Sequence, residues 1–216
     1  LVSCRQDDLP DSMPTAHEGY VALRFSADIP AMQEVVTRSV DPDGGGVQDM
    51  TLFCFDSYGL FTTTVEAKVT PTGNGAGLTG NFEAEVPENT RTVHFLANQN
   101  MSEFKEDKFR NKSEAEVMAL LEGSSGRMIY WARFTCDPDN DSKIDAQMAD
   151  KGNTIKMIRN HAQVSIDNPI NGWIEVTGFV AYNTNAFGTV APYHPEKGFD
   201  FEWPGEDDPF VTLPQN

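Results

Sequence analysis

This sequence has few basic side chains, few cysteines and no long apolar run. Its 16 Lys and Arg are outnumbered by 33 Asp and Glu, which gives a formal net charge of −17 at pH 7. Binding to nucleic acid or to anionic lipid depends on clustered Lys and Arg, so this composition argues against both. No apolar run approaches the ~20 residues of a membrane-spanning helix. What remains is an acidic chain long enough for one domain with a substantial core.

Motifs of common catalytic and metal sites are also missing. No nucleophile-elbow motif and no phosphate-binding glycine loop occurs. The histidines are too scattered to place two metal ligands on one strand or helix face, and the two in strand-like segments are expected to be structural. They are His17, His94, His161 and His194. The sequence therefore predicts no enzymatic activity, no cofactor and no metal site.

The acidic stretch DPDNDSKID (137–145) resembles the start of a calcium loop. Its sixth position is Ser142 and its twelfth is Met148, where such a loop has a glycine and a bidentate glutamate. We therefore predict a solvated acidic turn.

Short alternating segments separated by turn residues account for most of the chain. Residues 20–29 (YVALRFSADI) alternate strictly, which predicts a half-buried strand. Its apolar face consists of Val21, Leu23, Phe25, Ala27 and Ile29. Residues 52–55 are apolar on both faces, so their strand should lie inside a sheet. Further strand patterns occupy residues 60–70, 81–87, 91–98, 127–135, 161–166 and 172–183.

One helix is predicted at Ser113–Leu121, where Ser113 and Glu116 form a capping-box pattern and a glycine follows the end. Many short strands with one short helix in a connection predict a mainly β fold, an antiparallel β-sandwich. Cys54 and Cys136 both lie in apolar runs, which favours buried free thiols over a disulfide.

The N-terminal residues Leu1, Val2, Ser3 and Cys4 resemble the lipobox of bacterial lipoproteins, in which the cysteine is acylated after the signal peptide is removed. Residues 5–19 contain two prolines, several acids and little apolar content, as expected of a flexible tether. We expect a tether at 1–19, a sandwich domain at 20–185, and an exit linker at 186–216 that begins a further domain.

The loop VVTRSVDPDGGG (35–46) is long for a connection between two strands and contains Arg38. With this loop, the order of segments resembles the N-terminal domain of the fimbrillins. These are the FimA-like and Mfa-like lipoproteins that build type V pili in Bacteroides and its relatives. The matching series is the Cys4 tether, the first strand, the loop, NFEAEVPENTRTVHFLANQN, SEAEVMALL, IKMIRNHAQVSI and GFVAYNTNAFGTVAP, and it covers roughly residues 1–192.

The resemblance implies a transthyretin-like β-sandwich, lipid-anchored at Cys4 in the outer membrane and displayed at the cell surface. It implies a non-enzymatic pilus subunit that serves adhesion. An arginine-specific protease would cut after Arg38, the first strand would leave, and a strand of another pilus subunit would take its place by β-strand addition. The second domain and donor strand of the family are absent from this sequence, so we expect either a piece of a longer subunit, which we favour, or a shortened accessory protein.

A surface lipoprotein whose β-sandwich binds glycan is the alternative. Such a site needs exposed aromatic side chains that stack on sugar rings. The aromatic residues considered for it are Trp131, Trp173, Trp203 and Tyr193, although Trp131 and Trp173 occur in strand patterns where burial is expected.

Overall fold

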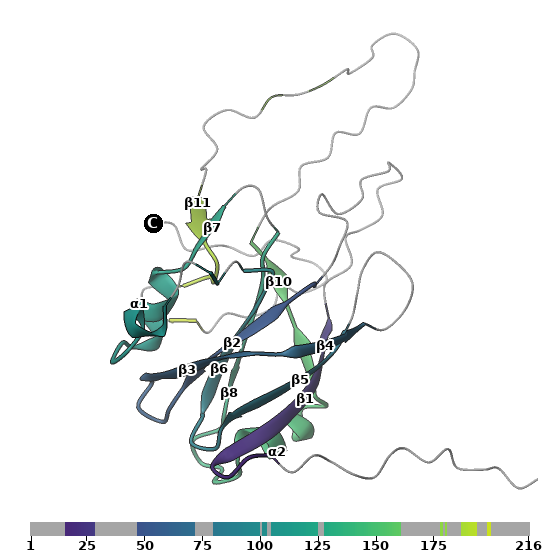
Figure 1. Cartoon of the computed structure of the whole chain (residues 1–216), viewed down its shortest axis with the longest axis vertical. Helices are drawn as coiled ribbons and strands as arrows, with labels where there is room; N and C mark the ends of the chain where they lie inside the picture. The colour runs from purple at the N-terminus through teal and green to yellow at the C-terminus, as the bar shows by residue number, and fades with distance from the viewer. Residues whose placement is uncertain are drawn as a thin grey trace, which may run out of the picture.

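The computed structural model describes residues 16–28, 47–71, 80–99, 101–102, 105–124, 128–160, 178, 180, 187–193 and 198–199. These residues form mainly β structure with short helices at the periphery (Figure 1). The strands are β1 (Tyr20–Asp28), β2 (Met50–Phe55), β3 (Phe61–Glu66), β4 (Lys68–Pro71), β5 (Gly80–Pro87), β6 (Thr92–Ala97), β7 (Glu122–Ser124), β8 (Tyr130–Thr135), β9 (Thr154–Lys156), β10 (Ile158–Arg159) and β11 (Phe187–Thr189). The helices are η1 (Glu106–Lys108), α1 (Glu114–Ala119) and α2 (Ile144–Asp150).

Two sheets form the sandwich. The first sheet has the strand order β4-β5-β1-β9 and the second sheet has the order β10-β8-β6-β2-β3, while β11 and β7 form a separate ribbon. Every pairing is antiparallel except that of β1 with β9, which is parallel. The predicted antiparallel β-sandwich is thereby confirmed.

The main core lies between the two sheets. Alternation in β1 and β5 sends every second side chain of the first sheet inward, where these side chains meet the inner face of the second sheet. The buried side chains include Leu23, Phe25 and Phe82 from the first sheet and Leu52 and Phe95 from the second. Burial of each such side chain stabilises the fold by about 1.5–3 kcal/mol.

The chain passes from one sheet to the other at two corners. Residues 60–70, predicted as one strand, form β3 in the second sheet and β4 in the first. They separate at Ala67, whose N–H donates to the carbonyl of Met50. At the other corner, β9 pairs with the first sheet and β10 with the second, and the N–H of Met157 between them donates to the carbonyl of Asp28.

The central strands β2 and β6 of the second sheet are buried on both faces. All six side chains of β2 are buried, which confirms the prediction of an interior strand. Its outer face carries a second apolar cluster that includes Phe53, Phe55 and Trp131, and α1 covers this cluster with Val117 and Met118. The outer face of the first sheet carries charged side chains instead. The two sheets therefore differ in how much of their surface meets water.

Helix α1 confirms the predicted capping box. Ser113 accepts a hydrogen bond from the Glu116 N–H, and the Glu116 carboxylate accepts one from the Ser113 N–H at 2.8 Å. The helix ends at Ala119, and Gly123, predicted to follow its end, lies in β7. The predicted strands at 161–166 and 172–183 lie outside the described residues, apart from residues 178 and 180.

Helix α2 is an element that the sequence did not predict. It begins at Ile144, within the acidic stretch 137–145, and buries Ile144 and Met148 in the main core. Figure 1 shows it beside the lower end of β1.

Substituting Ile144→Ala tests the contribution of α2. The side chain is fully buried, so we expect the free energy of unfolding to fall by about 2–5 kcal/mol in urea titrations. Asp150→Ala, at an exposed position of the same helix, should change it by less than about 0.5 kcal/mol. Equal effects of the two substitutions would contradict the packing described for α2.

Candidate functional site

The candidate site is the place that β1 occupies in the sandwich, here called the β1 seat: the facing edges of β5 and β9 with the inward rings of Phe82 and Phe95. The Phe25 ring lies parallel to the Phe82 ring at a centroid distance of 5.4 Å. It meets the Phe95 ring of the opposite sheet edge-on at 5.0 Å. Both arrangements are favourable for aromatic rings and add to the gain from burial.

The backbone of β1 is paired with β5 along most of one edge and with β9 along part of the other. Its antiparallel register with β5 runs from Tyr20 opposite Pro87 to Ser26 opposite Asn81. Its parallel register with β9 covers only the last part of the strand, from Ser26 opposite Thr154. β1 is therefore an interior strand whose removal would expose the backbone edge of β5 along its length.

The outward face of β1 and β5 carries ion pairs. Arg24 Nε lies 3.1 Å from Glu83 Oε1, and the two residues are opposite each other in the register. His17, which precedes β1, contacts Glu85 through Nδ1. The hydrogen bond with His17 lowers the pKa of Glu85, which is otherwise opposite the uncharged Ala22.

The predicted site residues divide between described and undescribed parts of the chain. Val21, Leu23, Phe25 and Ala27 are buried in the main core, and the outward side chains between them are exposed or half-buried. Cys4, Ile29 and Arg38 lie outside the described residues.

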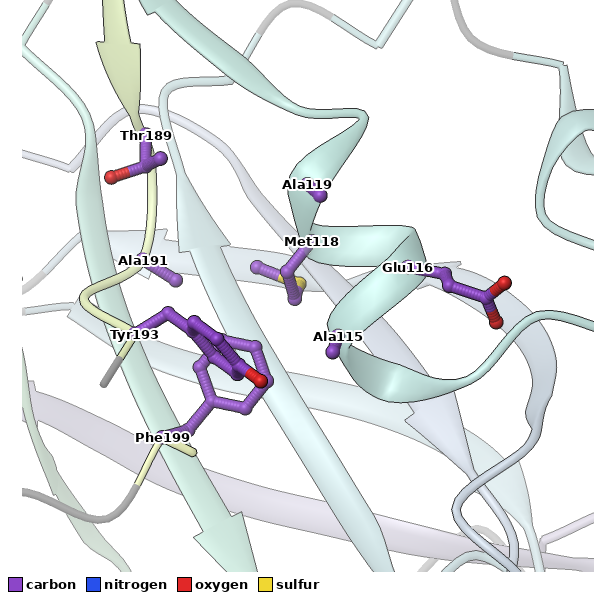
Figure 2. Close-up of a pocket in the computed structure, with 8 residues that line it drawn as sticks. All are labelled: Ala115, Glu116, Met118, Ala119, Thr189, Ala191, Tyr193 and Phe199. Atoms are coloured by element: carbon purple, nitrogen blue, oxygen red, sulfur yellow. The ribbon is translucent and has the colours of Figure 1, made fainter. Parts of the chain in front are cut away.

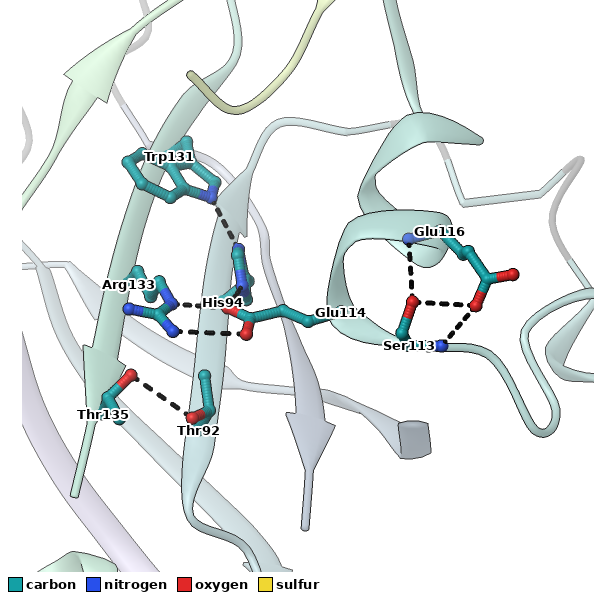
Figure 3. A network of polar contacts seen from close by, with 8 residues as sticks. All are labelled: Thr92, His94, Ser113, Glu114, Glu116, Trp131, Arg133 and Thr135. Carbon is teal, nitrogen blue, oxygen red and sulfur yellow. Dashed lines mark hydrogen bonds and ion pairs between the residues drawn. The ribbon is translucent and has the colours of Figure 1, made fainter. Parts of the chain in front are cut away.

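A buried polar network on the outer face of the second sheet binds α1 to that sheet (Figure 3). Trp131 Nε1–H donates to His94 Nδ1 at 2.9 Å, so the other ring nitrogen of a neutral His94 carries the proton. His94 Nε2 lies 2.6 Å from Glu114 Oε1, and Arg133 donates to the same carboxylate. Phe199 packs edge-on against His94 at 4.8 Å. The prediction that His94 is structural agrees with these contacts.

The pKa values in this network follow from burial and charge. Burial lowers the pKa of His94 against the opposite effect of Glu114, so the imidazole stays neutral. Burial opposes ionisation of Glu114, but hydrogen bonds from His94 and Arg133 outweigh it and lower its pKa to about 2. Glu114 was not identified from the sequence, because its partners lie on strands far away along the chain.

A cavity of about 360 Å³ lies between α1 and the chain that follows β11 (Figure 2). The Met118 side chain and the rings of Tyr193 and Phe199 point into it, and Glu116 points away. Hydrogen bonds from the backbone and side chain of Ser113 lower the pKa of Glu116. This carboxylate is thus engaged in the capping box and is poorly placed for acid–base chemistry in the cavity.

Other candidate residues have structural positions. Cys54 and Cys136 are buried free thiols, which confirms the preferred prediction, and burial raises the pKa of Cys54 to about 12. Trp131 is 2% exposed and cannot stack on a sugar, whereas Tyr193 is 40% exposed. Trp173 and Trp203 lie outside the described residues.

Among the described residues there is no group of three or more His, Cys, Asp or Glu side chains arranged to hold a metal ion. The described helices are all too short or too polar to cross a bilayer.

Comparisons with known proteins gave one distant structural match. No family model matches the chain, and no curated protein matches it. The crystal structure of a fimbrial assembly protein from Parabacteroides distasonis matches with 13% sequence identity and a TM-score of 0.34. The match covers 65% of this chain and 54% of that chain, so it spans about half the length of the solved protein.

The network makes a prediction for Glu114→Gln. A group whose folded pKa is depressed stabilises the fold above its unfolded pKa, here near 4.5, and this stabilisation is lost as the pH falls toward 2. Near pH 7 we expect the substitution to lower the free energy of unfolding by about 2–3 kcal/mol. The difference from the unsubstituted chain should shrink between about pH 5 and pH 3.

Urea titrations at several pH values measure this difference. The control is Glu122→Gln, at an exposed position shortly after α1, which should have little effect at any pH. A Glu114→Gln effect that does not change with pH would show that the carboxylate is not an ionised partner of His94 and Arg133.

Proposed function

We propose that the chain is the strand-accepting domain of a non-enzymatic subunit of a cell-surface pilus or fimbria, assembled by protease-triggered strand exchange and serving adhesion. The observation that carries the proposal is the position of β1 in the chain and in the fold. β1 is the first strand of the described residues, it is an interior strand of the first sheet, and the connection 29–49 joins it to β2. A single cut in that connection converts β1 into a separate peptide.

The physical consequence of such a cut supports strand exchange. Before it, the covalent link keeps β1 at a high effective concentration beside its seat, so a competing strand is excluded. Once the link is broken, β1 is held only by its backbone hydrogen bonds and by the burial of four apolar side chains. A strand of another molecule can then compete with β1 for the same place. The vacated seat offers an unpaired strand edge over an apolar groove, which is what β-strand addition requires.

The loop that contains Arg38 supplies the cleavage position in this proposal. The connection 29–49 is far longer than the usual link between two strands, and 35–46 is rich in turn residues. Proteases cut long exposed loops more readily than paired strands. Arg24 lies within β1, whose backbone is paired with β5, and is therefore the poorer substrate.

The remaining parts of the proposal follow from the family resemblance. The subunit is exported as a lipoprotein precursor with an acylated Cys4, anchored in the outer membrane, and residues 1–19 are the tether. Residues 20–185 form the strand-accepting domain and 186–216 lead into a further domain that donates a strand to another subunit. The partners are therefore other pilus subunits, an arginine-specific protease and the membrane through the lipid anchor.

Cleavage at Arg38 is the first test. Treatment of the full-length subunit with an arginine-specific protease should give one new N-terminus at Ser39, identified by mass spectrometry, and a ladder of polymers on a gel. Arg38→Lys is the matched control because it keeps the charge and should remain uncut and monomeric. Resistance of the unsubstituted loop would exclude Arg38 as the cleavage position, and cutting without polymers would exclude exchange after this cut.

A disulfide between β1 and β5 separates cleavage from strand departure. Ser26 and Asn81 are opposite each other in the register, so Ser26→Cys with Asn81→Cys places two thiols at a bridging distance. We expect this double variant to be cut at Arg38 yet to form no polymer until the disulfide is reduced. Polymerisation of the oxidised variant at the unsubstituted rate would show that β1 stays in place during assembly.

A further inference from the structure

The segment that would leave holds the two residues that contact the outward carboxylates of β5. Arg24 pairs with Glu83, and His17 pairs with Glu85. Both Arg24 and His17 precede Arg38 in the sequence and would leave with β1 after a cut there. The outward row of β5 would then present two carboxylates beside its open backbone edge.

The rest of the first sheet replaces these partners of Glu83 and Glu85 only in part. Lys68 of β4 lies opposite Glu83 on the far side of β5, and its charge also lowers the pKa of Glu85. Lys143, which precedes α2, is engaged with Glu88 at 2.6 Å. The vacated edge is therefore flanked by acidic side chains, in a chain whose net charge is already −17.

The inward side of the seat has a different requirement. The position of Phe25 is bounded by Phe82 of the same sheet and Phe95 of the opposite sheet, at ring distances of 5.4 and 5.0 Å. An aliphatic or small side chain at this point would leave part of that space unfilled, at the cost of lost contacts on both rings. A replacing strand therefore meets carboxylates at its outward positions and a ring-sized space at its inward position, and these positions alternate along a β-strand.

We infer that the strand which replaces β1 carries Lys or Arg at the outward positions opposite Glu83 and Glu85 and an aromatic side chain at the inward position opposite Phe82. The inference rests on the proposed function, since it names the partner of the β1 seat. It also gives the exchange a direction. β1 places the uncharged Ala22 opposite Glu85, so a strand with a basic residue there gains an ion pair that β1 itself lacks.

Peptides that compete for the β1 seat of the cut chain test this inference. The probes copy Tyr20–Asp28: a basic peptide with Ala22→Lys, an acidic peptide with Ala22→Glu and Arg24→Glu, and a third peptide with Ala22→Lys and Phe25→Ala. The chain is cut after Arg38 and the fluorescence of a labelled 1–38 segment reports its displacement. If Arg38 resists the protease, a viral-protease site inserted after Arg38 supplies the cut, so that failure of natural cleavage does not affect this test.

The basic peptide should displace the 1–38 segment at a concentration about tenfold lower than the acidic peptide at low salt, because opposite charges across a strand pair stabilise it and like charges destabilise it. The difference should decrease in 0.5 M salt (about a 4 Å screening length). Loss of the ring in the third peptide should weaken displacement by at least about 100-fold.

A charge-reversed chain is the matched control. In the cut variant with Glu83→Lys and Glu85→Lys, the acidic peptide should become the better competitor. Equal potency of the basic and acidic peptides on the unsubstituted chain would overturn the inference, as would a preference that charge reversal leaves unchanged. Retention of the 1–38 segment against every peptide would overturn it together with the proposed exchange.

Discussion

Phe25, stacked on Phe82 of its own sheet and edge-on to Phe95 of the opposite sheet, is an aromatic contact that joins the two sheets at the centre of the candidate site. The contact comes from β1, which is the first strand among the described residues. Aromatic contacts of this kind contribute about 0.5–1.5 kcal/mol each beyond the gain from burial. Under the proposed exchange, a strand that replaced β1 would need an equivalent ring at this position to keep both contacts.

The two sheets differ in what covers their outer faces. The second sheet is covered on its outer face by α1 and the apolar cluster around Trp131, and the His94–Glu114–Arg133 network fixes α1 to it. The first sheet exposes a row of charges on its outer face, with Arg24 and Glu83 opposite each other. Charge on this face can specify a partner strand, since exposed charges affect pairing preference more than they affect the stability of the core.

The sequence predicted those parts of the fold that have a local signal. Strict alternation located β1, β5 and β6, and the capping box located the start of α1. Helix α2 was missed because it is short, begins without a side-chain cap and follows an acidic turn that dominates the local pattern. Strands β9 and β10 have two or three residues each, too few for alternation to be recognised.

The candidate site was predictable to a similar, partial degree. The apolar face of β1 follows from its own sequence, but the partners of that face and the pairing with β9 come from residues more than fifty positions away. The break at Ala67 could not be predicted either, because both halves of 60–70 have strand propensity. Only the hydrogen bond from Ala67 to Met50 shows where β3 and β4 separate. Alternation specifies which face is buried, whereas the opposing strand depends on the whole topology.

The topology also determines which strand pairings and which part of the core would remain if β1 left. The second sheet has its own five-stranded ladder and a second apolar cluster on its outer face, and neither includes a residue of β1. In the first sheet, β5 stays paired with β4, which continues from β3 of the second sheet through the corner at Ala67. β9 stays joined to β10, which pairs with β8. Loss of β1 would thus leave an open groove between β5 and β9, while both of these strands stay joined to the intact second sheet. An incoming strand would therefore meet a site whose two edges are already in place.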